Sequence, residues 1–424
     1  WFTRREIKLI TFFNVFAVNI RSLFLVFLLL EFPRGCLIAD KVYRSNRRKA
    51  LGPIWNPGLF AFINGNIESM KKLEILHEPA GLAITRSRTQ LIVPPNQLKK
   101  EIPLSDYADA TVARARHDIQ RILSGEDRQR LILLSGPCSI HDPEAAMEYA
   151  TRLRDLESTF ADQLVVVMRV YFEKPRTALG WKGLIYDESI SGLPASPSGL
   201  RRARELLCKI SRLGVPCGTE FLNPIVASYL EDCIAYGSIG ARTVESQVHR
   251  ELASNMEMPV GIKNGTDGSL DSAINAVKAA RHSHTAFVCD GEGRPAILET
   301  PGNLFAHVCL RGGRSGPNLS MVAIEEVRTR LSTTSLERPI VMDCSHANSQ
   351  KDFRRQSGNA LDVAQMFASG GSAIAGLMIE SHLKEGNQSV EAGKDLVYGQ
   401  SITDACIGWE ETERLVGKIA ERID

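Results

Sequence analysis

The stretch Arg169-Val-Tyr-Phe-Glu-Lys-Pro-Arg-Thr177 runs from the last residue of an apolar segment into a loop with basic and hydroxyl side chains, a composition suited to phosphate. Other apolar segments of the chain also end in a chemically capable side chain: Leu131 to Cys138, Pro259 to Lys263, His307 to Arg311 and Pro339 to His346. Functional side chains at the ends of successive strands are typical of a parallel α/β barrel, whose active site forms at the carboxyl ends of its strands.

Eight apolar segments alternate with stretches of helical apolar spacing, such as Pro143 to Leu156, Leu200 to Leu213 and Ala360 to Phe367. The predicted strands are Leu131 to Gly136, Leu164 to Tyr171, Val215 to Glu220, Ser238 to Arg242, Pro259 to Lys263, His307 to Arg311, Pro339 to Asp343 and Ile374 to Glu380. This alternation predicts an α/β fold, a TIM (β/α)8 barrel. The segment Ala286 to Leu298 breaks the alternation, because two short apolar runs flank Asp290-Gly-Glu-Gly-Arg294, and it predicts an inserted β-hairpin.

The N-terminal segment differs from the rest of the 424-residue chain. Residues 1–69 hold ten Lys or Arg against four Asp or Glu, which leaves −4 for the remainder of a chain whose net charge is +2 (2 − 6). The apolar stretches Leu9 to Ile20 and Leu23 to Leu30 are each shorter than the roughly 20 residues of a membrane-spanning helix. We interpret residues 1–69 as a poorly ordered extension or translated upstream sequence, with a signal peptide or weak membrane anchor as the alternative. Residues 70–125 are predicted to form an N-terminal arm and a helix that stops at Gly125, and residues 126–424 the barrel.

Charge and cysteine usage exclude several classes of protein. The acidic body, with basic residues scattered over strand ends, argues against a nucleic-acid surface. The nine cysteines, from Cys36 to Cys406, include no CxxC pair and suit a reduced, cytoplasmic chain better than a disulfide framework.

The predicted barrel brings ten chemically capable side chains to one mouth, the last of them from a terminal loop. They are Cys138, Arg169, Lys174, Glu220, Arg242, Lys263, Arg311, His346, Glu380 and Asp404. Because five of them are cations, the mouth requires anionic groups, which predicts a substrate with several negative charges. The sulfur, nitrogen and oxygen donors of Cys138, His346, Glu380 and Asp404 suit a divalent transition metal. Taken singly, a cysteine such as Cys138 is more often a small buried side chain than a metal ligand, and His382 is a rival ligand.

Several long sequence motifs resemble those of a known enzyme family. Three of them are Gly136-Pro-Cys-Ser-Ile-His-Asp-Pro143, Lys263-Asn-Gly-Thr-Asp-Gly268 and Ser401-Ile-Thr-Asp-Ala-Cys-Ile-Gly-Trp409. Together with the Arg169 stretch and Ser345-His-Ala-Asn348, they resemble 3-deoxy-D-arabino-heptulosonate 7-phosphate (DAHP) synthase, in the branch shared by enteric bacteria and fungi. The resemblance extends from about residue 105 to the end. It implies a metal-dependent, aldol-type condensation of phosphoenolpyruvate with erythrose 4-phosphate and water, the first step of the shikimate pathway to aromatic amino acids.

The resemblance also implies residue roles. Cys138, His346, Glu380 and Asp404 would hold Mn²⁺, Fe²⁺, Zn²⁺ or Co²⁺; Arg169, Lys174, Arg242, Lys263 and Arg311 would bind phosphoenolpyruvate; Arg176 and Thr177 would bind the sugar phosphate. Lys174 would transfer a proton, and Glu220 or a metal-bound group would act as base. Cys138 and His346 count among the catalytic residues as well, and His346 among the substrate contacts.

Two other functions remain as alternatives. One is the related synthase that joins phosphoenolpyruvate to arabinose 5-phosphate, whose loop composition differs from Lys174-Pro-Arg-Thr177. The other is a catalytically silent barrel that binds metal or phosphate.

The residues that would form a regulatory pocket match those of the family only in part. Phe221 and Leu252 fit the pocket in which relatives bind an aromatic amino acid, but Glu257 replaces a small polar residue and Ala286 an aromatic one. A buried Glu257 would carry a desolvation cost. The alternatives are an aromatic amino-acid effector (Phe, Tyr or Trp), another ligand, or weak regulation. The resemblance also implies a homodimer or homotetramer.

Overall fold

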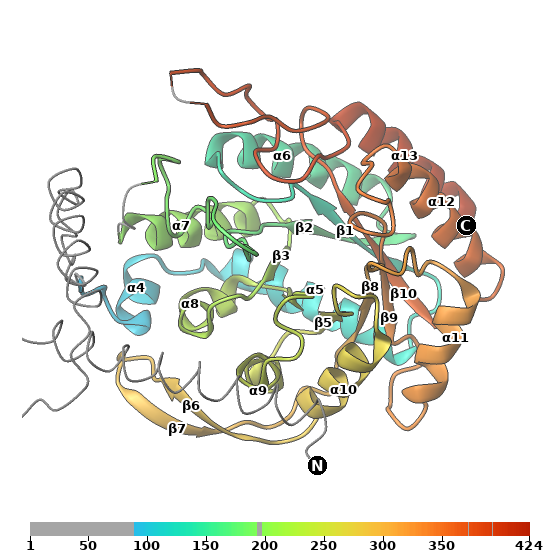
Figure 1. Ribbon diagram of the computed structural model, residues 1–424, viewed down its shortest axis with the longest axis horizontal. Coiled ribbons are helices and arrows are strands. Elements are labelled where there is room, and N and C mark those ends of the chain that lie inside the picture. The colour runs from blue at the N-terminus through green and yellow to red at the C-terminus, as the bar shows by residue number, and fades with distance from the viewer. Residues whose placement is uncertain (1–88, 193–196, 372, 392) are drawn as a thin grey trace, which may run out of the picture. The chain divides into compact units, whose positions relative to one another are not determined.

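The protein folds as a closed barrel of eight parallel strands in this computed structural model, which describes residues 89–192, 197–371, 373–391 and 393–424 (Figure 1). Around the barrel the strands follow the order β1-β10-β9-β8-β5-β4-β3-β2. They are β1 Leu131–Gly136, β2 Leu164–Arg169, β3 Cys217–Glu220, β4 Tyr236–Ile239, β5 Val260–Lys263, β8 Ala306–Leu310, β9 Ile340–Asp343 and β10 Ile374–Glu380. The predicted barrel is therefore confirmed.

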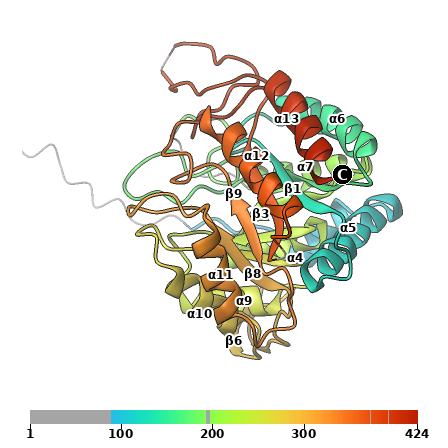
Figure 2. The ribbon, with the colours of Figure 1, turned by 90° about the vertical axis from the view of Figure 1, so that its right-hand side faces the viewer.

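Each barrel strand is followed by an α-helix, so that the helices form an outer layer (Figure 1). They are α6 Pro143–Thr159, α7 Ser198–Arg212, α8 Pro224–Leu230, α9 Gln247–Asn255, α10 Leu270–Ala280, α11 Met321–Arg330, α12 Arg355–Ala368 and α13 Trp409–Ile423. A 3-10 turn, η1 Glu231–Cys233, lies between α8 and β4. The last helix, α13, packs against α12 (Figure 2).

The barrel strands are buried along their whole length, as expected for strands covered by helices on one side and filled by side chains on the other. The ends of two helices have the residue types that favour capping. Asp142 caps α6 by accepting hydrogen bonds from the backbone N–H groups of Glu144 and Ala145. Gly125 ends helix α5, Asp106–Ser124, in a left-handed conformation with a φ of 82°, at the predicted stop.

In the described part of the chain, two helices precede the barrel and one pair of strands lies outside it. Helices α4 (Pro95–Glu101) and α5 come before β1. The predicted hairpin is present as antiparallel strands β6 (Thr285–Cys289) and β7 (Pro295–Glu299). On its outer face Phe287 and Ile297 pair with each other and are exposed by 85% and 66%.

Several predicted boundaries differ from the structure. Strand β4 ends at Ile239, so the predicted strand to Arg242 is too long at that end, and β2 ends at Arg169 instead of Tyr171. In both places the chain leaves the sheet ladder to form the loops of the barrel mouth. The proposed disorder of residues 1–69 and the possible anchor lie outside the described residues. None of the described helices is long and apolar enough to cross a membrane.

Candidate active site at the barrel mouth

A pocket of about 600 Å³ opens at the carboxyl ends of the strands. Its lining includes most of the side chains that the sequence predicted to converge: Lys174, Arg176, Glu220, Arg242, Lys263, Arg311, His346, Glu380 and Asp404. Cys138 and Arg169 are fully buried beside it, and Thr177 lies at its edge, where it accepts a hydrogen bond of 3.2 Å from Arg242 Nε. The fold thus gathers side chains from β1 to β10 at one end of the barrel.

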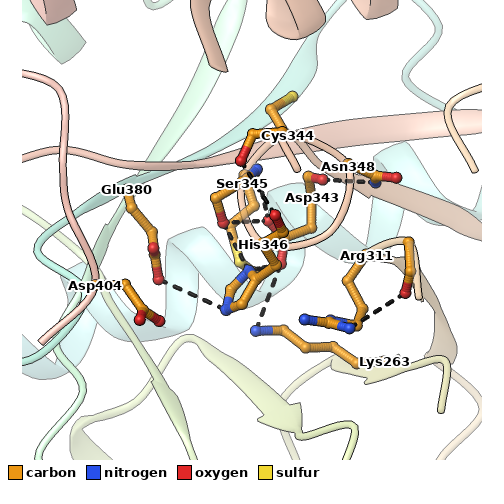
Figure 3. Close-up of polar contacts among 12 residues, drawn as sticks. Lys263, Arg311, Asp343, Cys344, Ser345, His346, Asn348, Glu380 and Asp404 are labelled. Carbon is orange, nitrogen blue, oxygen red and sulfur yellow. Dashed lines mark hydrogen bonds and ion pairs between the residues drawn. The ribbon is translucent and has the colours of Figure 1, made fainter. Parts of the chain in front are cut away.

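Three potential metal ligands lie close together. One donor atom each of Cys138, Glu380 and Asp404 lies within 4.8 Å of the other two. The thiol of Cys138 donates to Asp404 Oδ2 at 3.6 Å, and His346 Nε2 is 3.7 Å from Glu380 Oε1 (Figure 3). One thiolate, one imidazole and two carboxylates form a donor set that fits a first-row divalent metal. The rival His382 does not belong to this group in the described residues; its Nδ1 accepts the backbone N–H of Leu383.

Lys174 contacts the same cluster from the β2 loop. Its ammonium group donates to Cys138 Sγ at 3.1 Å and to the Cys138 carbonyl oxygen at 3.2 Å. Burial raises the pKa of the Cys138 thiol to about 11, and the charge of Glu380 adds to this. Burial opposes the charge of Lys174, but Cys138, Glu380 and Asp404 outweigh it and raise the Lys174 pKa. Lys174 is therefore an ammonium ion at neutral pH.

A buried ion pair joins Arg169 to the cluster. Arg169 Nη2 is 3.1 Å from Glu380 Oε1, and the two side chains are exposed by only 1% and 2%. The guanidinium also lies over the ring of Tyr171, 4.1 Å from its centroid. Burial disfavours the charge of Arg169, but Tyr171 and Glu380 overcome this and raise its pKa. Its Nε is a buried donor without a hydrogen-bond partner among the described residues, which leaves it available to a ligand.

Lys263 is a buried cation in the lining of the pocket. Its Nζ lies 3.6 Å from Asp343 Oδ2, 3.9 Å from Glu220 Oε2 and 5.6 Å from the centroid of the Tyr171 ring. Burial disfavours its charge, but these neighbours raise its pKa. Glu220 Oε1 is buried and has no hydrogen-bond partner in the described part of the chain. Lys263 is thus a buried cation that adjoins an incompletely satisfied carboxylate at the pocket wall.

Arg311 and Arg176 are placed mainly by contacts with backbone and amide groups. The backbone N–H of Arg311 donates to Asn264 Oδ1 at 2.8 Å, and its guanidinium donates to the Gly312 carbonyl at 3.2 Å. Arg176 Nε donates to the Trp181 carbonyl at 2.7 Å. Neither guanidinium is joined to a carboxylate by an ion pair within the described residues, so both can receive an anion.

Asp343 is a site residue that sequence reasoning did not assign. It is fully buried and lies between His346 Nδ1, at 2.9 Å, and Lys263 (Figure 3). Its Oδ1 accepts hydrogen bonds from the backbone N–H and the hydroxyl of Ser345 at 3.0 and 2.6 Å. Burial opposes its charge, but His346 and Lys263 hold its pKa well below the usual range. Its position as the last residue of a predicted strand was the available indication.

Two features hold the metal-cluster residues in place. His346 has a left-handed backbone, with a φ of 53°, a costly conformation for a residue with a side chain. Asn348 stabilises this turn by donating to the carbonyls of Leu310 and Asp343 at 3.0 and 2.8 Å. From α12, Gln356 donates to the Glu380 carbonyl and accepts its N–H, at 3.1 and 2.7 Å. No sequence pattern indicated Gln356, because this contact depends on how α12 packs on the barrel.

The residues matched to the relatives' effector pocket lie elsewhere, near α8, α9 and the hairpin. Phe221 and Ala286 are buried, and Leu252 packs against the core. The concern about a buried Glu257 is wrong: its side chain is 85% exposed and forms an ion pair of 2.9 Å with Arg116. Because water solvates this carboxylate, it carries no large desolvation cost.

These features define a class: a (β/α)8 barrel with a cation-rich pocket for anions and an adjoining cluster able to bind a metal. The sequence pattern of the DAHP synthetase I family matches residues 101–416. The chain belongs to this family.

Individual relatives agree. The chain is 50% identical, over 332 residues, to the Phe-sensitive phospho-2-dehydro-3-deoxyheptonate aldolase of Escherichia coli strain K12, covering 78% of this chain and 94% of that protein. It is 46% identical over 338 residues to the Trp-sensitive enzyme of the same strain, covering 80% and 97%. The structure of the corresponding aldolase from Francisella tularensis SCHU S4 superposes with a TM-score of 0.77 at 42% identity, covering 80% of this chain and 98% of that one.

Proposed function

We propose that the chain is a DAHP synthase, which condenses phosphoenolpyruvate with erythrose 4-phosphate and water to give DAHP and inorganic phosphate. One observation carries the proposal: a single pocket is lined by seven lysines and arginines and adjoins a cluster of thiol and carboxylate groups, with the His346 imidazole beside it. Both substrates are phosphate esters, and one of them also has a carboxylate, so binding them together requires several cations. Membership in the family supports the same reaction.

The cations divide into two sets by position. Arg169, Lys263 and Arg311 lie deep in the barrel or partly buried, and with Lys174 and Arg242 they would bind the phosphate and carboxylate of phosphoenolpyruvate. Arg176 and Thr177 are exposed on the β2 loop and would bind the phosphate of the sugar. Arg242 is also exposed and donates to Thr177 Oγ1 at 3.2 Å, so it lies where the two phosphate sites meet.

Proton transfers are assigned from charge state and reach. The enol carbon of phosphoenolpyruvate attacks the aldehyde carbon, forming the C–C bond and an alkoxide. Lys174, which is held as an ammonium ion, donates the proton that this oxygen takes up. Water then adds to the cationic second carbon of the former phosphoenolpyruvate. Glu220, whose Oε1 has no hydrogen-bond partner among the described residues, accepts the proton of this water before phosphate leaves. Stabilising the developing alkoxide is the electrostatic task of the site.

Cys138, His346, Glu380 and Asp404 would hold a divalent cation such as Mn²⁺, Fe²⁺, Zn²⁺ or Co²⁺. Such an ion supplies a Lewis acid for the carbonyl oxygen of the sugar. Lys174 and His346 favour the ionised form of one ligand: their charges overcome the effect of burial on Asp404 and lower its pKa. Cys138 and His346 take part in catalysis through this cluster, and His346, which lines the pocket, also contacts substrate.

The assembly and regulation of the enzyme are also proposed. We assign it to the cytoplasm, as a homodimer or homotetramer. The relatives named Phe-sensitive and Trp-sensitive support an aromatic amino acid as effector.

The decisive test is phosphate release by the purified protein with phosphoenolpyruvate and either erythrose 4-phosphate or arabinose 5-phosphate. We expect turnover with the tetrose only, lost with chelator and restored by Mn²⁺. Lys174→Met should abolish turnover, whereas Lys182→Met, at an exposed lysine of the same loop, should retain it. Turnover with the pentose would move the chain to the related synthase, and silence with both sugars in folded, metal-loaded protein would mean a binding-only barrel.

A further inference from the structure

Two cysteines far from the pocket face each other inside the helical layer. Cys208 lies on α7 and Cys233 ends η1, 25 positions further along the chain, and their sulfur atoms are 3.9 Å apart. Both are buried, with exposures of 4% and 0%. A disulfide has an S–S distance of about 2.05 Å, so the two sulfurs would have to approach by about 1.9 Å. Since η1 is a three-residue turn, a small local shift can supply part of this movement.

An arginine next to the pair favours a reactive thiolate. The guanidinium of Arg204, itself 1% exposed, donates to Cys233 Sγ at 3.5 Å and holds Asp232 with two contacts of 2.7 Å. The thiol of Cys233 donates a hydrogen bond to the Cys208 sulfur and so lowers the pKa of Cys208. Burial raises this pKa, whereas the charge of Arg204 lowers it further. The same hydrogen bond and burial raise the pKa of Cys233. A thiolate beside a protonated thiol and a cation is the arrangement in which cysteine is nucleophilic.

We propose that Cys208 and Cys233 form an oxidation site that a hydroperoxide converts to an intramolecular disulfide. The Cys208 thiolate attacks one oxygen of the hydroperoxide; the O–O bond breaks, and Cys208 becomes a sulfenic acid as the oxidant is reduced to water or an alcohol. The sulfur of Cys233 then attacks the Cys208 sulfur, forming the S–S bond and releasing water. In total, two thiols lose two protons and two electrons to one hydroperoxide, and a dithiol reductant reverses the change by exchange.

The site lies where the N-terminal elements attach to the barrel. Arg204 Nε donates to the carbonyl of Ile102, and Arg116 of α5 donates to the carbonyls of Glu231 and Ile234, on either side of Cys233. A disulfide would tie α7 to η1 at this junction. Because it closes a loop in the unfolded chain, the oxidised protein should resist urea better than the reduced protein.

The test is mild treatment of folded, Zn²⁺-loaded protein with hydrogen peroxide, since Zn²⁺ is redox-inert. Free thiols are then alkylated and the peptides mapped. We expect one cross-linked peptide pair containing Cys208 and Cys233, lighter by two hydrogen atoms and restored by a dithiol reductant. Cys208→Ser and Cys233→Ser should each abolish it.

Cys217 provides the matched control. It is buried in the same region, but its sulfur contacts Ser211 Oγ and the Val215 carbonyl, and burial raises its pKa to about 12. Cys217→Ser should keep the cross-link, and Cys217 in the wild type should oxidise more slowly than the pair. The proposal is overturned if folded protein gives no Cys208–Cys233 peptide, or if the pair forms as fast in urea-unfolded chain, because the fold would then contribute nothing. A folded Cys233→Ser protein whose Cys208 yields a sulfenic acid would further support Cys208 as the attacking sulfur.

Discussion

Removing Arg169 from its buried ion pair with Glu380 should destabilise the chelator-treated protein far more than removing one partner of a surface pair. Their 3.1 Å separation corresponds to about 5 kcal/mol of attraction at an effective dielectric constant of 20. Arg169→Met leaves the Glu380 carboxylate buried without its cation. Removing one partner of a buried pair costs about 3–5 kcal/mol, a large part of the roughly 5–15 kcal/mol that stabilises a typical protein.

The assay is urea unfolding of chelator-treated protein at pH 7, followed by circular dichroism. Arg152→Met is the control, because Arg152 and Glu148 on α6 are closer, at 2.7 Å, but exposed by 46% and 38%. An exposed pair contributes at most about 1 kcal/mol. Adding Glu380→Gln to Arg169→Met should recover part of the loss, since no unpaired charge then remains. Equal losses for the Arg169 and Arg152 variants would refute the argument that burial makes the pair strong.

Three further predictions concern Asp343, His307 and Gly183. Asp343→Asn should weaken metal binding about 10- to 100-fold, equal to roughly 1.4–2.8 kcal/mol, because Asp343 orients the imidazole of His346. Competition with a chelating dye measures the metal affinity, and an unchanged affinity would contradict the prediction. Burial lowers the pKa of His307 to about 4, so the unfolded chain takes up a proton below about pH 6.5 and stability falls as the pH falls towards 4. In His307→Asn the unfolding free energy should therefore depend on pH less steeply, by about 1.4 kcal/mol per unit in that window, and parallel curves would contradict this. Gly183 has a φ of 112°, and in Gly183→Ala the new methyl group would overlap the Phe172 carbonyl and displace the Lys174 loop. We expect kcat/KM to fall by as much as about 100-fold. Gly192→Ala is the control: Gly192 has a φ of 71° and lies in open space, so kcat/KM should be unchanged.

The sequence alone determined the barrel and its mouth. Apolar segments of strand length, alternating with helical spacing, indicated eight strands, and β1 and β10 begin and end at the predicted residues. This worked because strands covered on both sides must be apolar throughout, a pattern that is local in sequence. Polar residues just after such segments, including Cys138 and Arg311, could be assigned to one end of the barrel for the same reason.

Only the tertiary structure decided which groups meet. Gln356 reaches the backbone of Glu380 from a helix, and Cys208 faces Cys233 across 25 positions, because helix packing brings these residues together. The exposure of Glu257 was likewise set by its place on the folded surface. Sequence patterns record the periodicity of single elements, whereas contacts between elements depend on packing geometry, which no local pattern encodes.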